Sequence, residues 1–180
     1  MSKIYDKIFP DESIGDDMKI YQSAIRLSWT EPKHFIKLKR ELVFGSFLKD
    51  VLKFFKLMNS EKSPRKKFLN LKEIYNSVVF LLKFNGVGAD AGVDDQLPII
   101  NYSIVKSQKL PELRLDSNSK FMKLYIGEKK NKLEGSQLAQ LSSACSFIAN
   151  LKYTDLIGVS YDEFVRNCNE ATIKDDTKKN

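Results

Sequence analysis

The chain has 180 residues, of which 42% are hydrophobic and 29% are charged, a composition typical of one globular domain. Thirty basic against 23 acidic residues leave a net charge of +7, which excludes collagen-like, fibrous and acidic disordered proteins. Two cysteines and one histidine are too few for a disulfide framework or a Cys/His zinc site, so we expect no metal. No apolar run reaches the roughly 20 residues needed to cross a bilayer, and no signal-peptide core follows Met1, so we expect a cytoplasmic protein.

Apolar residues recur at helical spacing throughout the first half of the chain. The pattern predicts helices over residues 15–28, 42–58 and about 65–84. Between the first two, Thr30 is a candidate N-cap for a short helix that ends at Leu38. The first half is therefore expected to be helical without a strand.

A glycine-rich stretch, residues 85–93, predicts a loop before the next apolar segment. The in-phase apolar residues that follow indicate a helix that begins at Asp94 and carries Pro98 in its first turn, where a missing N–H is tolerated. A β-strand is the alternative for this segment, because its Ile, Val and Tyr residues favour strands. An acid directly before an apolar run is also an ordinary N-cap, so Asp94 has a structural interpretation as well as a functional one.

Three further helices are expected toward the C-terminus. One follows Ser117, one begins near Ser136 after a lysine-rich loop, and one opens with a capping box at Ser160. No internal repeat or second domain is apparent. We expect one helical domain over residues 1–172 and a disordered tail over residues 173–180.

The lysine runs lie in three separate places, residues 62–67, 129–132 and 174–179, rather than in one stripe. Such runs are usually solvated loops. Because no RNP-type aromatic motif or zinc-finger spacing accompanies them, no nucleic-acid partner is expected. An acidic protein surface or an anionic membrane remains an alternative partner for these lysines.

The motifs of common enzyme chemistries are not present. The glycines of residues 85–93 match neither the P-loop nor the dinucleotide-binding pattern. His34 is best explained as a histidine on a helix surface, and Cys145 as a small hydrophobic residue. The adjacent acids Asp16-Asp17 and Asp94-Asp95 diverge by about 100° on a helix and cannot converge on one substrate. We therefore expect neither hydrolytic chemistry nor a cofactor.

Several short motifs nevertheless follow one another in a distinctive order. They are Ile8-Phe9-Pro10, Leu27-Ser28-Trp29-Thr30-Glu31-Pro32-Lys33-His34-Phe35, Asp94-Asp95-Gln96-Leu97-Pro98, Leu115-Asp116-Ser117-Asn118, Gly127-Glu128 and Leu141-Ser142-Ser143-Ala144. Together they resemble the VPS-nine (VPS9) domain family, the catalytic module of guanine-nucleotide exchange factors for Rab-five-class endosomal GTPases. The resemblance covers about residues 4–170.

The resemblance implies an all-α layered fold in which two helices form a shallow groove for the switch regions of a small GTPase. In this chain the two helices would be those that begin at Asp94 and near Ser136. Asp94 matches the acidic finger that enters the nucleotide site, and Pro98 and Asn101 would line the same groove. Asp95 and Tyr102 match positions that we expect to be structural. The implied partner is a Rab-five-class GTPase, with recruitment to endosomal membranes and possible peripheral membrane association.

The chain departs from the family pattern on the second helix. Ser136 stands where the family commonly has tyrosine, Ala139 where it has threonine and Gln140 where it has asparagine. An alternative register takes residues 133–135 instead of Gly127-Glu128 as the turn before this helix, and it also lacks the tyrosine. Since an aromatic contact can be worth a few kcal/mol, exchange could be weakened, redirected to another GTPase or replaced by binding alone. A non-catalytic GTPase-binding or adaptor domain is therefore the alternative function.

Overall fold

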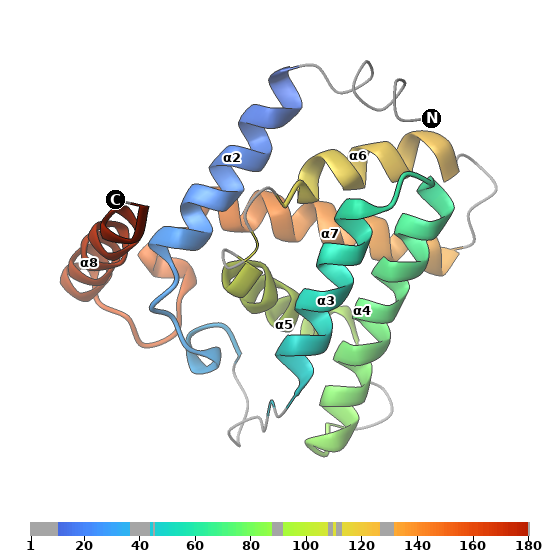
Figure 1. The fold of residues 1–180 in the computed structure, drawn as a ribbon. Helices are drawn as coiled ribbons and strands as arrows, with labels where there is room; N and C mark the ends of the chain where they lie inside the picture. Colours follow the sequence, from blue (N-terminus) through green and yellow to red (C-terminus); the bar gives the residue numbers. More distant parts are fainter. Residues whose placement is uncertain are drawn as a thin grey trace.

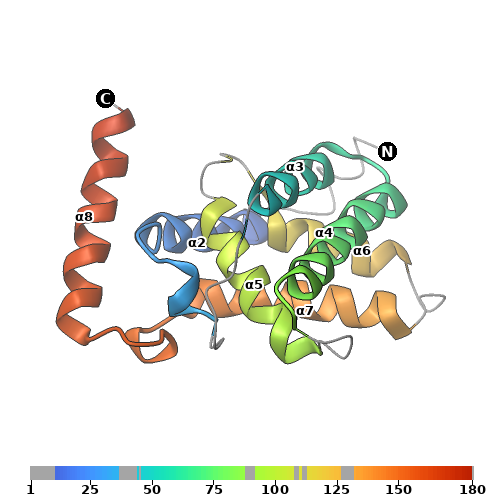
Figure 2. The same ribbon diagram turned by 90° about the horizontal axis from the view of Figure 1, so that it is seen from below.

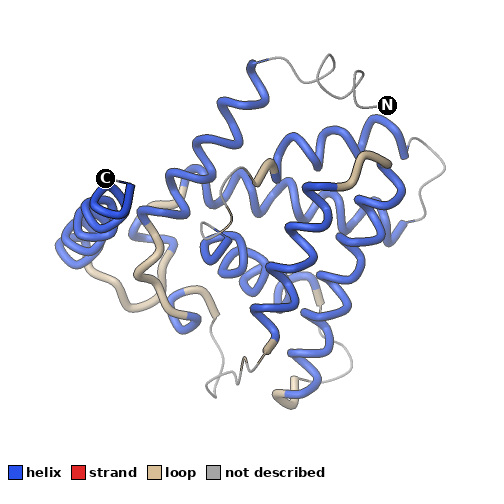
Figure 3. Tube along the Cα trace, in the orientation of Figure 1, coloured by secondary structure: helices blue, strands red, loops and turns tan. Residues whose placement is uncertain are grey.

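The computed structural model describes residues 11–36, 44, 46–87, 92–107, 110, 113–126 and 132–179. The described elements are α2 (Asp11–Arg26), η1 (Pro32–His34), α3 (Phe47–Ser60), α4 (Pro64–Phe84), α5 (Val93–Lys106), α6 (Leu115–Ile126), α7 (Lys132–Asn150), η4 (Tyr153–Asp155) and α8 (Tyr161–Lys179). All are helices, and Figure 3 shows no strand in the described ranges. The all-α prediction is confirmed, and the strand alternative for the segment after Asp94 is wrong.

The helices form layers around one apolar core (Figure 1). α3 and α4 run antiparallel, lie side by side and pack on α5 and α6. α7 packs against α5, α2 and α6, whereas α8 lies at the opposite side of the molecule from α4 and packs on α2. The middle of the core is therefore made where α5 and α7 meet beneath the α3–α4 hairpin (Figure 2).

A buried lysine joins three of these helices. Lys67, on the first turns of α4, is 1% exposed. Its Nζ donates to the carbonyl oxygens of Met58 and Asn59 at 2.9 and 3.3 Å and to Oδ1 of Asn118 on α6 at 2.7 Å. The last carbonyls of a helix have no partner within the helix, so a cation there satisfies groups that would otherwise be unpaired. Lys67 thus fixes the end of α3 against α4 and α6.

A second lysine fixes the segment between α2 and η1. Nζ of Lys106, in the last turn of α5, donates to the carbonyl oxygens of Ser28 and Thr30 at 2.8 and 2.7 Å. It also lies 5.2 Å from the ring centroid of Tyr102. The two carbonyl bonds hold the chain after α2 against the C-terminal end of α5.

The structure corrects several element boundaries. α7 begins at Lys132, so Gly135 and Ser136 lie inside the helix rather than at the end of a loop. Thr30 is not an N-cap, because its Oγ1 donates backward to the carbonyl of Leu27 at 2.7 Å and η1 starts after Glu31. His34 is buried rather than on the surface, with Nδ1 accepting the N–H of Glu31 at 3.0 Å.

The C-terminal end also differs from expectation. α8 continues to Lys179 and so includes residues 173–179, which were expected to be disordered. Two features support the extra turns: Lys174 and Glu170 form an i,i+4 ion pair at 3.8 Å, and Oγ1 of Thr177 donates to the carbonyl of Ile173 at 3.0 Å. Such local pairs stabilise a helix end by a few tenths of a kcal/mol each.

Candidate functional site

The first turn of α5 places two adjacent acids in different roles. Gly92 precedes the helix with extended backbone, and Oδ2 of Asp95 accepts the Gly92 N–H at 3.0 Å. The Asp95 side chain therefore takes part in capping the N-terminus of α5. Asp94, at the second helical position, is not the N-cap, so the capping interpretation of this residue is wrong.

The Asp94 side chain is exposed, and the part of the chain that the structure describes gives it no hydrogen-bond or ion-pair partner. The partial positive charge of the helix N-terminus stabilises a carboxylate at this position. Pro98 lies in the second turn of α5, not the first as expected, and its missing N–H leaves the Asp94 carbonyl without the usual i+4 donor. The start of α5 thus presents a charged side chain to solvent.

The remaining α5 residues of interest point into the protein. Tyr102 is 8% exposed, and its ring lies 5.4 Å from that of Phe44 and 6.1 Å from that of Phe35, measured between centroids. Burial raises the pKa of the Tyr102 hydroxyl. Asn101 is 6% exposed, and its Oδ1 has no hydrogen-bond partner among the described residues. Asn101 was expected to line an open groove, but so little of its side chain is exposed that it cannot form much of a contact surface.

The second helix of the expected groove is α7, which packs against α5. Ala139 is exposed and Ser136 is half-buried. Gln140 is 8% exposed, and its Nε2 donates to Oγ of Ser136 at 3.1 Å. The side of α7 that carries Ser136 and Ala139 therefore has small side chains. The hydrogen bond from Gln140 fixes the position of the Ser136 hydroxyl.

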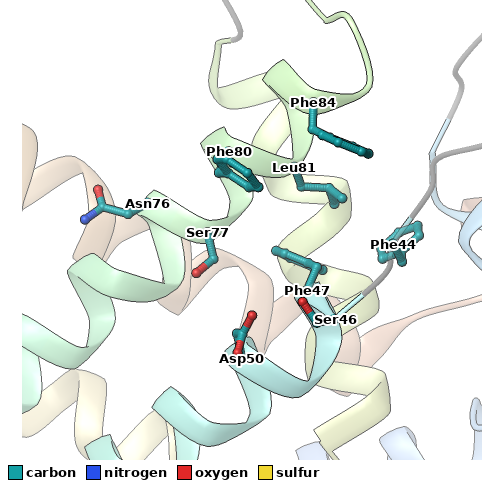
Figure 4. A pocket seen from close by; sticks show the side chains of 9 residues that line it. All are labelled: Phe44, Ser46, Phe47, Asp50, Asn76, Ser77, Phe80, Leu81 and Phe84. Atoms are coloured by element: carbon teal, nitrogen blue, oxygen red, sulfur yellow. The ribbon is translucent and has the colours of Figure 1, made fainter.

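A separate hollow lies between α3 and α4, and Asp94 does not line it. Figure 4 shows this pocket, whose volume is about 580 Å³. It is lined by Phe44, Ser46, Phe47, Asp50, Asn76, Ser77, Phe80, Leu81 and Phe84. Phe80 and Phe84 are 70% and 66% exposed, and their rings stack at 6.3 Å. This exposed aromatic pair was not expected from the sequence, although two phenylalanines spaced i,i+4 beside polar residues were a readable signal.

Some predicted motifs lie outside the described residues. They are Ile8-Phe9-Pro10, Gly88 of the glycine-rich loop, and Gly127-Glu128. Within the described ranges, no cluster of three His, Cys, Asp or Glu side chains is placed to hold a metal ion. Across the same ranges, no helix combines the length and the apolarity needed to span a membrane.

Comparison with known proteins identifies the family. The family model of the Vacuolar sorting protein 9 (VPS9) domain matches residues 48–153, from α3 to η4, which is more than half of the chain. The matched range includes both Asp94 and Ser136, whereas the Trp29 motif precedes it. None of the curated proteins matches the chain. The chain belongs to the VPS9 domain family.

Proposed function

We propose that this chain is a guanine-nucleotide exchange factor that releases GDP from a small GTPase of the Rab-five class. The observation that carries the proposal is the exposed carboxylate of Asp94, which starts a helix packed on α7 and has no partner among the described residues. A carboxylate that stabilises the protein's own fold would accept hydrogen bonds or form an ion pair. Asp95 and Asp17, for example, accept backbone N–H groups at helix starts. Asp94 is instead available to a partner.

The chemistry that we propose for Asp94 is electrostatic competition. A small GTPase holds GDP through a P-loop lysine and a Mg²⁺ ion on the phosphates. A carboxylate inserted there competes for the lysine and repels the phosphate, in a site where a low dielectric strengthens charge interactions. Nucleotide held at picomolar affinity corresponds to about 16 kcal/mol, and a ~10³–10⁵-fold faster release requires the barrier to fall by about 4–7 kcal/mol. No covalent step or cofactor is needed.

The other groove residues divide into two roles in this proposal. Pro98 is partly exposed and Ala139 is exposed, and both are available to contact a switch region together with Ser136. Asn101 and Gln140 are buried and act by positioning α5 and α7 rather than by direct contact. Asp95 and Tyr102 have structural roles. Asp95 caps the N-terminus of α5, and Tyr102 packs against Phe44.

The test is release of fluorescent GDP from a panel of Rab-five-class GTPases. We expect the chain to accelerate release from at least one of them and Asp94→Ala to lower that acceleration about 10²-fold, the typical cost of removing one transition-state charge contact. The matched control is Asp162→Ala, since Asp162 is exposed and occupies the same second helical position in α8. Equal loss in both variants, or no loss in Asp94→Ala, contradicts the role of Asp94.

A non-catalytic GTPase-binding or adaptor function is the alternative, and Ser136 favours it. The chain has a small hydroxyl where the family commonly has an aromatic side chain, so part of the switch contact is absent. This function predicts a stable complex with nucleotide-free GTPase and no acceleration of GDP release. Size-exclusion chromatography of the mixture, run beside the release assay, distinguishes the two.

A further inference from the structure

The exposed positions within helices α3 and α4 carry an excess of basic residues. They include seven basic and two acidic residues, a large share of the chain's net charge of +7. The basic residues are Lys49, Lys53, Lys56, Arg65, Lys66, Lys72 and Lys83, and the acids are Asp50 and Glu73. Over residues 161–177 of α8, by comparison, the exposed acids Asp162, Glu170 and Asp176 outnumber the exposed bases Arg166 and Lys174. Among the described side chains, α3 and α4 therefore carry an excess of exposed basic residues that α8 does not.

The three lysines of α3 form one stripe. Lys49, Lys53 and Lys56 are spaced i, i+4 and i+7, which places them on one side of the helix. Phe47, Val51, Phe55 and Met58 are the buried residues of the same helix and lie on the opposite side. The lysine stripe therefore faces away from the core.

Large apolar side chains are exposed among these charges. Leu57 and Leu69 are 38% and 46% exposed, and the stacked pair Phe80 and Phe84 more so. α3 and α4 lie side by side on the outside of the α5–α7 layer in both views (Figures 1 and 2). We call this surface the hairpin face: the exposed residues of α3 and α4 that are named above.

We infer that the hairpin face docks on an anionic lipid bilayer. Lysines beside Leu and Phe are the composition of surfaces that rest at the headgroup level of a membrane, where the lysines meet lipid phosphates and carboxylates and the rings enter the acyl boundary. Six of the seven cations are lysines, which suit point-charge contact with headgroups, and the one arginine, Arg65, is already paired with Glu134 at 2.9 Å. Base recognition in nucleic acid relies more on free arginine, so RNA fits this face less well.

The docking geometry is compatible with action on a membrane-anchored partner. α4 ends at Phe84 and α5 begins at Val93, and Figure 2 shows the end of α4 and the start of α5 on the same side of the molecule. The first turn of α5, which includes Asp94, therefore lies toward the end of α4 that carries the exposed aromatic pair. Membrane binding by this face does not depend on nucleotide exchange, and it can be tested in the absence of any GTPase.

The experiment is co-sedimentation of the full chain with vesicles of phosphatidylcholine alone or mixed with phosphatidylserine. We expect binding to the mixed vesicles and little to the neutral ones. Each lysine near an anionic surface contributes roughly a fivefold gain in partitioning, so Lys49→Glu with Lys53→Glu should weaken binding at least about 25-fold. The matched control carries the same charge change on α8, Arg166→Glu with Lys174→Glu, and should bind nearly as the unmodified chain does.

A second variant tests the apolar part of the contact. Phe80→Ser with Phe84→Ser leaves the core intact, since both rings are mostly exposed. We expect about 1 M salt to release this variant fully from the vesicles, because charge interactions are then screened beyond about 3 Å. Absence of binding to anionic vesicles overturns the inference. An equal loss of vesicle binding in the α8 control also overturns it, because the attraction would then come from net charge and not from the hairpin face. Tighter binding to single-stranded RNA than to vesicles, abolished by the same lysine variant, overturns it as well.

Discussion

Lys67 is an unusual residue of the core, because its ammonium group is buried and donates to two carbonyl oxygens and one amide oxygen. Carbonyl and amide oxygens bind a cation less strongly than a carboxylate does, so they offset only part of the cost of burying the charge. Burial lowers the pKa of Lys67 to about 8. The group is therefore charged at neutral pH at a cost to the folded state.

This pKa predicts how stability depends on pH. In the unfolded chain lysine stays protonated up to about 10.4, so between about pH 8 and 10 the unfolded state binds more protons and the free energy of unfolding rises with pH. We expect a gain of about 1 kcal/mol between pH 8 and 9 from Lys67 alone. Urea unfolding of the unmodified chain and of Lys67→Met at both pH values measures it, because the difference between their slopes removes the contributions of other groups. Parallel pH profiles for the two proteins would contradict this prediction.

Among the helices, α6 owes its start to a side chain far away in sequence. Oδ1 of Asp17 on α2 accepts the N–H groups of Asp116 and Ser117 at 2.8 and 3.3 Å, and Oδ2 accepts the Ser117 hydroxyl. These N–H groups belong to the first turn, which has no acceptor within the helix. Asp17 thus caps α6 across about a hundred residues of chain and joins it to α2.

Removal of this cap should destabilise the whole fold. We expect Asp17→Ala to lower the free energy of unfolding by about 2 kcal/mol, near the upper end of measured cap losses. Its neighbour Asp16 provides the control, because Asp16 forms half-exposed ion pairs with Lys120 and Lys19 that are worth about 1 kcal/mol or less. Denaturant unfolding measures the free energy of unfolding of both variants. An equal decrease in the two would mean that the cap by Asp17 stabilises the fold no more than a surface charge does.

The same cap shows what the sequence could and could not predict about elements. Apolar periodicity predicted that these segments are helical, because burial of one side imposes a 3.6-residue repeat. It misplaced the starts of α2 and α3, which begin at Asp11 and Phe47 rather than at residues 15 and 42. The start of α5 was misplaced by one residue and that of α7 by about four. The start of α7 depends on tertiary contacts. Arg65, for example, pairs with Glu134 in the first turn of α7. The sequence near Glu134 cannot predict this partner, because Arg65 lies 69 positions away.

At the scale of the whole molecule, the sequence could propose a set of candidate site residues but not the surface that they form. The motif that contains Asp94 placed one acid at a helix start, and the structure leaves that acid exposed. The burial of Asn101 and Gln140 could not be foreseen, since it depends on how α5 and α7 rotate against each other. The lysines of α3 and α4 appeared as scattered charges in the sequence, and only the packing of the two helices against each other brings these elements side by side.

Asp94 lies on α5, which packs against both helices of the hairpin face, so the effects of the two on exchange should combine in a particular way. With a GTPase tethered to anionic vesicles, we expect the chain to release GDP faster than from the same GTPase free in solution, because docking raises its local concentration. Lys49→Glu with Lys53→Glu should abolish this vesicle-dependent gain and leave the solution rate unchanged, whereas Asp94→Ala should lower both rates. Stopped-flow release of fluorescent GDP with and without vesicles measures the six rates, two for each of the three proteins. If the lysine variant also slows exchange in solution, the hairpin face contacts the GTPase itself, and the separation of catalysis at α5 from docking at α3 and α4 is wrong.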